Sequence, residues 1–358
     1  MKKEDYIDGA RYKKLISTLE NAINDTKDFR DASDLTSFQS LQLAIWAMRI
    51  QEDLRDLSIY IRNDYMQEFR KDKSQNATIN PHEDRVKIGL ADKETVGIGI
   101  NEYTKIHANS FGPFSPVQYF QDQKRIVIVD WEPYTLNGDL EKLDIGELSF
   151  LGGKKQDIDF STYDSFEAPT HRIAVDFCQQ LLSKYSLDLS KDEVMQSTMC
   201  ILQHNFFPAL AFSGNTSSDK DLIQKTWSVW NKELLSYLLH FYSGKIIIGS
   251  RDNLNYLCTP YDGLFNVAIE DGNIESEGES TESLLSKYSD AAIIGRKIIQ
   301  SWFNHKLGGK GASALLDECG TIWIGYVHCA SRRGDQWTSV DQEELASWIK
   351  RIMPDLIS

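Results

Sequence analysis

The chain has 358 residues, of which 41% are hydrophobic and 26% are charged, and its formal net charge is -14. This composition is typical of a folded globular protein and excludes collagen-like and intrinsically disordered chains. No run of residues approaches the roughly 20 apolar residues that a membrane-spanning helix needs. The polar start Met-Lys-Lys-Glu-Asp lacks the apolar core of a secretion signal, so we expect a cytoplasmic protein that does not enter a membrane.

The first 115 residues are expected to form an extension that is mostly helical. Apolar residues recur with helical spacing over residues 4–24 and 36–70. A polar linker follows at residues 71–80, and residues 85–107 alternate in the manner of β-strands. The extension contains no catalytic group of residues. Its simplest role is to pack as helices against the rest of the protein, and the alternatives are binding of DNA, of a partner or of a second subunit.

Residues 116–358 have the alternating pattern of an α/β domain. Short β-branched runs occur at residues 125–130, 198–203, 245–248 and 321–327, and helical patterns between them are clearest at 172–185 and 222–241. This order predicts a central four-stranded, mainly parallel sheet flanked by helices. The functional ends of parallel strands lie at one edge, where open α/β sheets bind their ligands.

Each of the four runs is followed by a residue suited to chemistry or to close approach of a phosphate. These residues are Glu132, Asn205, the pair Gly249 and Ser250, and His328. Two of them have a purely structural alternative: Glu132 as a turn cap and His328 as a hydrogen-bonded core residue. His204 competes with Asn205 for the site, because neighbouring strand residues point to opposite faces.

These motifs resemble, in order and chemistry, those of the uracil-DNA glycosylase superfamily. The first motif of its uracil-specific branch is Gly-Gln-Asp-Pro-Tyr-His, and residues 130–135 here read Asp-Trp-Glu-Pro-Tyr-Thr. The resemblance puts Glu132 in the place of the water-positioning aspartate. Tyr134 takes the place of the tyrosine that guards the base pocket, and Phe150 that of the ring that stacks on the extruded base, with Trp131 as a further stacking ring.

The resemblance extends to the remaining motifs over residues 115–350. Ala168-Pro169-Thr170-His171 resembles the phosphate-binding loop, Asn205 the residue that reads the pyrimidine edge, and Gly249-Ser250 the Gly-Ser loop. Residues 328–333, His-Cys-Ala-Ser-Arg-Arg, resemble the final His-Pro-Ser-Pro-Leu-Ser motif. In this alignment Ser331, Arg332 and Arg333 contact DNA, and Arg332 takes the place of the wedge in the base stack. The chain departs from the family where Glu132 replaces aspartate, Thr135 replaces histidine, and Cys329 and Ser331 replace prolines.

The expected activity is that of a monofunctional DNA glycosylase, an N-glycosyl hydrolase that leaves an abasic site in single- or double-stranded DNA. A carboxylate such as Glu132 stabilises the sugar cation, and His328 donates to the base as negative charge develops there. No lysine lies in these motifs to form a Schiff base. The departures from the family motifs, together with an expected insertion at residues 253–315, favour a modified pyrimidine as the substrate and a role in defence against modified phage DNA. Tyr134, in contrast, favours uracil as the substrate and a role in DNA repair.

Metal ions and other cofactors are not expected. The cysteines are odd in number and lack CxxC spacing: Cys178, Cys200, Cys258, Cys319 and Cys329. This pattern indicates a reducing compartment and no zinc or iron-sulfur site.

The net charge of -14 is unfavourable for a DNA-binding protein, because phosphate neutralisation dominates such binding. Much of the acidity lies in residues 270–282, which are expected to be a solvated or disordered loop. Residues 291–303 are expected to form an amphipathic helix. Two further classes of protein stay open: an inactive DNA-binding module of the same fold, and an acidic interaction or inhibitor protein. The sequence does not identify a protein partner.

Overall fold

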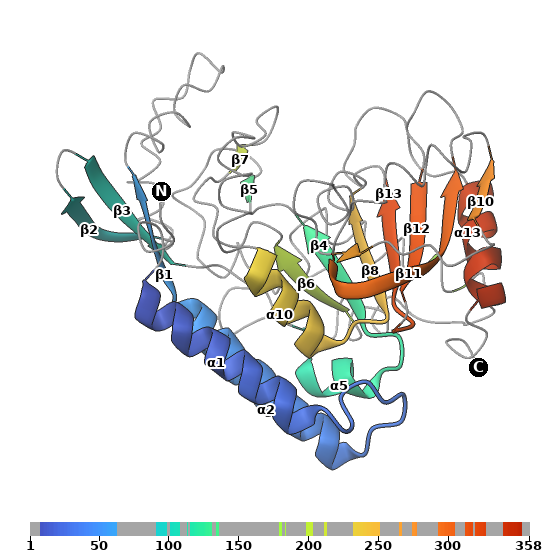
Figure 1. Cartoon of the computed structure of the whole chain (residues 1–358), viewed down its shortest axis with the longest axis horizontal. Helices are drawn as coiled ribbons and strands as arrows, with labels where there is room; N and C mark the ends of the chain where they lie inside the picture. Colours follow the sequence, from blue (N-terminus) through green and yellow to red (C-terminus); the bar gives the residue numbers. More distant parts are fainter. Residues whose placement is uncertain are drawn as a thin grey trace.

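The computed structural model describes residues 8–62, 91–98, 101–107, 113, 115–130, 134–135, 179–180, 183, 198–202, 211–212, 232–250, 265–266, 274–277, 293–304, 312–317, 319–326 and 339–352. A large sheet dominates these residues, with a pair of long helices near the amino ends of its parallel strands (Figure 1).

The four strands expected from the sequence are all present and lie side by side. They are β4 (Ile126–Asp130), β6 (Thr198–Leu202), β8 (Ile246–Ser250) and β13 (Ile322–Tyr326). Their order in the sheet is β6, β4, β8, β13, and every neighbouring pair is parallel. The prediction of an α/β fold with a parallel arrangement of these strands is confirmed.

The sheet does not stop at four strands. Beyond β13 it continues through β12 (Ala312–Asp317), β11 (Ile293–Asn304) and β10 (Ile274–Glu277), with the short β9 (Phe265–Asn266) also paired to β11. β12 is antiparallel to both of its neighbours, whereas β9 and β10 are parallel to β11. The sheet is therefore mixed and has eight strands. The segment expected as an insertion contributes four of them.

Two predictions for this segment are wrong. Residues 291–303 were expected to be an amphipathic helix, but β11 occupies most of them, because four β-branched isoleucines and pairing on both sides outweigh the helical spacing. The acidic stretch at 270–282 was expected to be a loop, but residues 274–277 form the edge strand β10. In sequence this edge strand contains two glutamates, Glu275 and Glu277, and charged residues in an edge strand discourage pairing with another sheet.

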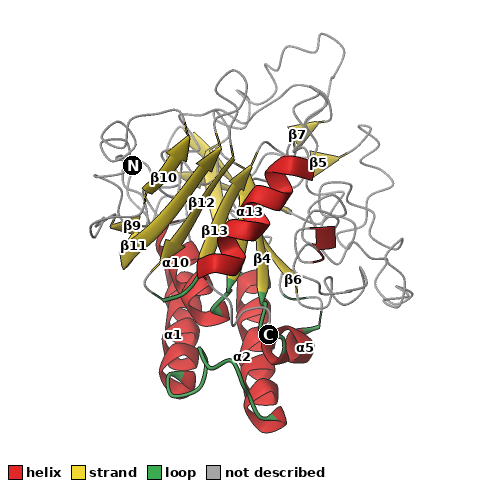
Figure 2. Ribbon diagram, turned by 90° about the vertical axis from the view of Figure 1, so that its right-hand side faces the viewer, coloured by secondary structure: helices red, strands yellow, loops and turns green. Residues whose placement is uncertain are grey.

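Both faces of β4, β8 and β13 are covered. Successive residues of β4, from Ile126 to Val129, are all buried, and the same holds for residues 246–248 and 322–324. Figure 2 shows α13 (Ser339–Ile352) crossing one face of the sheet, with α10 (Lys232–Tyr242) on the other side. The expected helix at 222–241 is confirmed where it overlaps α10. Of the expected helix at 172–185 only residues 179, 180 and 183 are described, and they are helical.

The amino-terminal helices share the core that covers the parallel strands. α1 (Gly9–Thr26) begins at the Asp8 cap, and α2 (Ser37–Asp56) begins with a capping box made by Thr36 and Gln39. α1 packs on α2 and α10, and α2 packs on the short α5 (Pro116–Gln121). One hydrophobic cluster includes Leu15 of α1, Ile50 of α2, Leu238 of α10 and Val127 of β4. The domain boundary expected at residue 115 stays a prediction.

The second helix of this region is shorter than expected. The helical pattern at 36–70 predicts one long helix, but α2 ends at Asp56 and β1 (Ser58–Arg62) follows. The Leu57 backbone is extended, and residues 58–61 alternate with Ile59 and Ile61 in the β-branched positions. β1 joins β3 (Asn101–His107) and β2 (Ala91–Ile98) in an antiparallel sheet, which confirms the β-pattern expected there.

A buried arginine connects the α1–α2 loop, α5 and β4. Arg125 is 1% exposed and its Nη1 donates to the Arg30 carbonyl at 2.6 Å. Its Nη2 donates to the carbonyls of Ala32 at 3.0 Å and Phe120 at 3.2 Å. The Arg125 backbone adopts φ 35°, which is unusual for a residue with a side chain. Burial lowers the pKa of its guanidinium.

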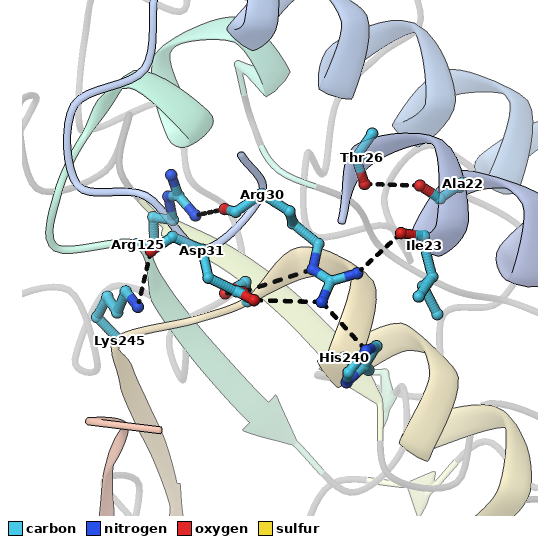
Figure 3. Close-up of polar contacts among 9 residues, drawn as sticks. Ala22, Ile23, Thr26, Arg30, Asp31, Arg125, His240 and Lys245 are labelled. Atoms are coloured by element: carbon cyan, nitrogen blue, oxygen red, sulfur yellow. Dashed lines mark hydrogen bonds and ion pairs between the residues drawn. The ribbon is translucent and has the colours of Figure 1, made fainter. Parts of the chain in front are cut away.

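The same loop is fixed to α10 and β8 by a second group of polar contacts (Figure 3). Arg30 contacts Asp31 and lies 3.1 Å from Nε2 of His240, which must accept because a guanidinium only donates. Asp31 also accepts a short hydrogen bond from Ser243. Burial raises the pKa of the Asp31 carboxyl, but Ser243 and the charges of Arg30 and Lys245 outweigh burial, so the pKa falls below its ordinary value.

Replacing Arg125 by methionine should lower the free energy of unfolding by about 2 to 4 kcal/mol, because three carbonyls lose their donor while a similar volume is kept. Urea unfolding followed by circular dichroism measures this. The matched control is Gln123→Met, an exposed neighbour in the same segment, for which a change within about 0.5 kcal/mol is expected. Equal stability of the two variants would contradict the role assigned to Arg125.

Gly244 lies where the chain passes close to β4. A Cβ at this position would be 2.6 Å from Cγ2 of Val127 and 3.3 Å from the carbonyl oxygen of Arg125. We expect Gly244→Ala to cost about 1 to 3 kcal/mol of stability through this overlap. In a double-mutant cycle with Val127→Ala the two losses should be less than additive, since the second change removes the colliding methyl. Gly9→Ala, which meets nothing within 4 Å, is the control.

Candidate functional site

The carboxyl ends of the four parallel strands meet at one edge of the sheet. Asp130 of β4 pairs with Leu202 of β6, and Val129 pairs with Gly249 of β8. Tyr326 of β13 pairs with Ser250. In the sequence, Glu132 follows Asp130 by two positions, and His328 follows Tyr326 by two. The ends of β4 and β13, which precede the expected catalytic residues, therefore lie at the same edge of the sheet with the end of β8 between them.

Two glycines lie next to each other at this edge. Gly249 pairs with Gly325 in the parallel ladder between β8 and β13. Glycine within a strand often marks a place where a ligand or another backbone approaches closely. Gly249 was expected at this edge from the sequence and Gly325 was not, although a glycine inside the apolar run Ile-Trp-Ile-Gly-Tyr was a signal for it.

A second, small pairing joins the segments that follow β4 and β6. β5 (Tyr134–Thr135) and β7 (Ala211–Phe212) are parallel, with Tyr134 opposite Ala211. Figure 1 shows both beyond the carboxyl ends of the neighbouring strands β4 and β6. The chain thus brings together Tyr134 and the segment that comes after Asn205 in sequence.

A buried carboxylate fixes the start of β13. Asp317 accepts from the backbone amides of Cys319 and Thr321, both at 2.9 Å, and from Nε1 of Trp323 at 3.0 Å. The Thr321 hydroxyl donates to the Gly244 carbonyl at 3.1 Å, which connects this turn to the start of β8. These contacts set the register between β8 and β13, and with it the position of Gly325 and Tyr326. This network was not expected from the sequence, because one acidic residue before a turn carries no distinctive signal.

Three residues of the expected site are described: Tyr134 in β5, and Gly249 and Ser250 at the end of β8. Gly249 is buried. The others lie outside the described residues, and their contacts stay predictions: Trp131, Glu132, Phe150, Pro169, Thr170, His204, Asn205, His328, Ser331, Arg332 and Arg333.

No cluster of three or more possible metal ligands occurs among the described residues. Within the same part of the chain no helix has the length and apolar character needed to cross a membrane.

No protein-family model, no curated protein and no solved structure matches this chain.

Proposed function

We propose that this protein is a monofunctional DNA glycosylase that removes uracil or a modified pyrimidine from DNA. The observation that carries the proposal is the contiguous parallel order β6, β4, β8, β13. In sequence, Asn205, Glu132 and His328 follow β6, β4 and β13, and Ser250 ends β8. The resemblance to the uracil-DNA glycosylase superfamily depends on these residues acting at one site. A topology that separated the strands would have removed its basis.

The proposed roles follow from the charges that develop when an N-glycosidic bond breaks. The sugar becomes cationic and the departing base anionic, so the site needs a carboxylate on one side and a donor on the other. Glu132 stabilises the sugar and orients water, and His328 donates to the base. The base leaves as an anion that takes up a proton, and hydroxide from the water completes the abasic sugar.

Recognition of the base requires it to leave the stack. Asn205 offers one acceptor and two donors in a plane, which suits the Watson-Crick edge of a flipped pyrimidine, and His204 is the alternative at the same strand end. Tyr134, Phe150 and Trp131 provide aromatic surface for stacking. The pairing of β5 with β7 supports this assignment, since it joins the segment of Tyr134 to the one that follows Asn205.

Contacts with DNA phosphate are assigned to segments near the strand ends in sequence. Gly249 and Ser250 end β8, and its pairing with the glycine-containing end of β13 suits close approach of a backbone. Pro169 and Thr170 supply the phosphate loop, and Ser331, Arg332 and Arg333 supply the final contact. With a net charge of -14, binding has to depend on such local contacts and not on the overall field.

The first experiment measures abasic-site formation on DNA containing uracil, thymine mismatches, hydroxymethylated cytosine or glucosylated cytosine. The wild type should act on one class of base, and Glu132→Gln should lower kcat at least about 100-fold while DNA binding changes little. Glu52→Gln, on an exposed position of α2, is the control that should keep full activity.

The pattern of substrates decides the biological role. Cleavage confined to uracil assigns the protein to repair, and cleavage confined to a modified base assigns it to defence against modified DNA. A folded protein that binds DNA but cleaves none of these substrates would reject catalysis and favour an inactive DNA-binding module.

Arg332 should affect binding to DNA more than chemistry. Removing one phosphate contact in Arg332→Ala should weaken binding and make the slope of log K against log salt concentration shallower by about 1. Titrations by fluorescence anisotropy at several salt concentrations measure this. Lys13→Ala, an exposed change on α1, should leave the slope as it is. An unchanged slope in Arg332→Ala would remove this residue from the DNA interface.

The net charge supports one other class of function. An acidic protein can bind a basic partner at the surface that would otherwise hold DNA, as an inhibitor does. This alternative predicts no DNA binding at any salt concentration and no effect of Glu132→Gln, so the same two experiments distinguish it from a glycosylase.

A further inference from the structure

Helix α2 is apolar on two opposite sides, and only one of them is covered. Leu43, Ala47, Ile50 and Leu54 are buried in the shared core. On the other side, four large apolar side chains are 41% to 74% exposed: Phe38, Leu41, Ile45 and Met48. We call these four residues the α2 stripe.

The segment that carries the stripe contains no charge. Residues 37–48 read Ser-Phe-Gln-Ser-Leu-Gln-Leu-Ala-Ile-Trp-Ala-Met, without Asp, Glu, Lys or Arg. In a protein with 26% charged residues, a surface helix normally carries charge on its solvent side. A helix that is apolar on two opposite sides is typical of one that is buried on both sides. The second side of α2 therefore has the composition of an interface.

The spacing of the stripe indicates the shape of the partner. The intervals are three, four and three residues, which is the alternation by which one helix packs along another in a coiled coil. The order of these intervals is the same whether the stripe is followed from Phe38 to Met48 or from Met48 to Phe38. A second α2 helix running in the opposite direction therefore presents an identical pattern, as a two-fold symmetric interface requires.

We propose that α2 pairs with α2 of a second copy of this chain in antiparallel orientation. Leu41 then lies opposite Ile45 of the partner subunit, and Phe38 lies opposite Met48 of the partner subunit. The largest side chain faces the flexible methionine at both ends, and branched side chains meet in the middle. Methionine adapts well to such irregular contacts.

The charges at the two ends of the stripe fit this orientation. Asp34 is exposed just before the amino end of α2, and Arg49 is exposed just after Met48, where its guanidinium lies 5.0 Å from the Trp46 ring. Antiparallel pairing brings Arg49 toward the partner subunit's Asp34. A parallel pair would place Arg49 beside the partner subunit's Arg49. The two helix dipoles also oppose each other in the antiparallel arrangement.

The position of α2 is compatible with the proposed glycosylase site, although the dimer does not depend on that function. α2 packs on α5, which leads into the amino end of β4. The candidate site is at the carboxyl end of that strand, so pairing through α2 leaves it open. Stable interfaces cover about 800 Å² on each partner, more than four side chains supply, and a dimer that forms and dissociates with concentration is expected.

Sedimentation equilibrium of the full-length protein, from low micromolar to submillimolar concentration, tests the pairing. The wild type should dimerise reversibly, and Leu41→Glu or Ile45→Glu should raise the dissociation constant at least about tenfold. Asn21→Glu, an exposed polar position on α1, is the matched control. Since both stripe positions are exposed in one chain, thermal unfolding of the variants should change little. A wild type that stays monomeric, or variants that dimerise like it, would overturn the proposal.

Disulfide cross-linking tests the orientation. Chains carrying Leu41→Cys and chains carrying Ile45→Cys are mixed, with distinguishable tags, and compared with each variant alone and with the wild type for background from native cysteines. The antiparallel pair should give several-fold more cross-linked product in the mixture than in either sample alone. Greater self-cross-linking of each variant would show a parallel pair and contradict the proposed geometry.

Discussion

The position of the helices relative to the sheet depends on the burial of Arg125. A guanidinium removed from water loses its hydration, and this loss is offset where its donors find other acceptors, as Nη1 and Nη2 of Arg125 do, although its buried Nε does not. Here the carbonyls come from two places: Arg30 and Ala32 in the loop after α1, and Phe120 in α5. Each of these carbonyls is therefore held at a fixed distance from Arg125, the residue that directly precedes β4. Arg125 thus connects the sheet, α5 and the loop between the amino-terminal helices. The same elements contribute side chains to the hydrophobic cluster.

The fold was predicted correctly where the local sequence pattern and the tertiary contacts favour the same secondary structure. The runs that became β4, β6, β8 and β13 are short, apolar and rich in β-branched residues, as strands buried on both faces are. For residues 291–303 the spacing favoured a helix, but most of them belong to β11, which pairs with β12 on one side and with β9 and β10 on the other. Such partners are distant in sequence, so a local pattern does not contain them. Asp317 and Arg125 were missed for the same reason: their roles come from acceptors and donors on other elements.

For the candidate site, sequence reasoning identified which strands carry it but not how its side chains are arranged. The register of β8 against β4 and β13 confirms that Gly249 and Ser250 belong to the same edge as the ends of the other strands. It also adds Gly325, whose importance depends on its neighbour across the ladder. Whether Asn205 or His204 faces the base is decided by the direction of the chain after Leu202, a property of the loop and not of residue type. The roles of Glu132 and His328 therefore depend on the resemblance and on the experiments above.

The contact between α1 and α10 has a consequence for synthesis on the ribosome. Tyr12 hydrogen-bonds to Glu233, and Tyr237 donates to Glu20 at 3.0 Å, so the first helix meets its partner only after more than 200 further residues are made. At translation rates of about 5 to 20 residues per second, this leaves the apolar side of α1 without α10 for at least roughly 10 seconds. During that interval α1 and α2 cover each other in part, and the nascent chain depends on this helical hairpin, or on a chaperone, to keep Leu15 and Leu19 from binding elsewhere.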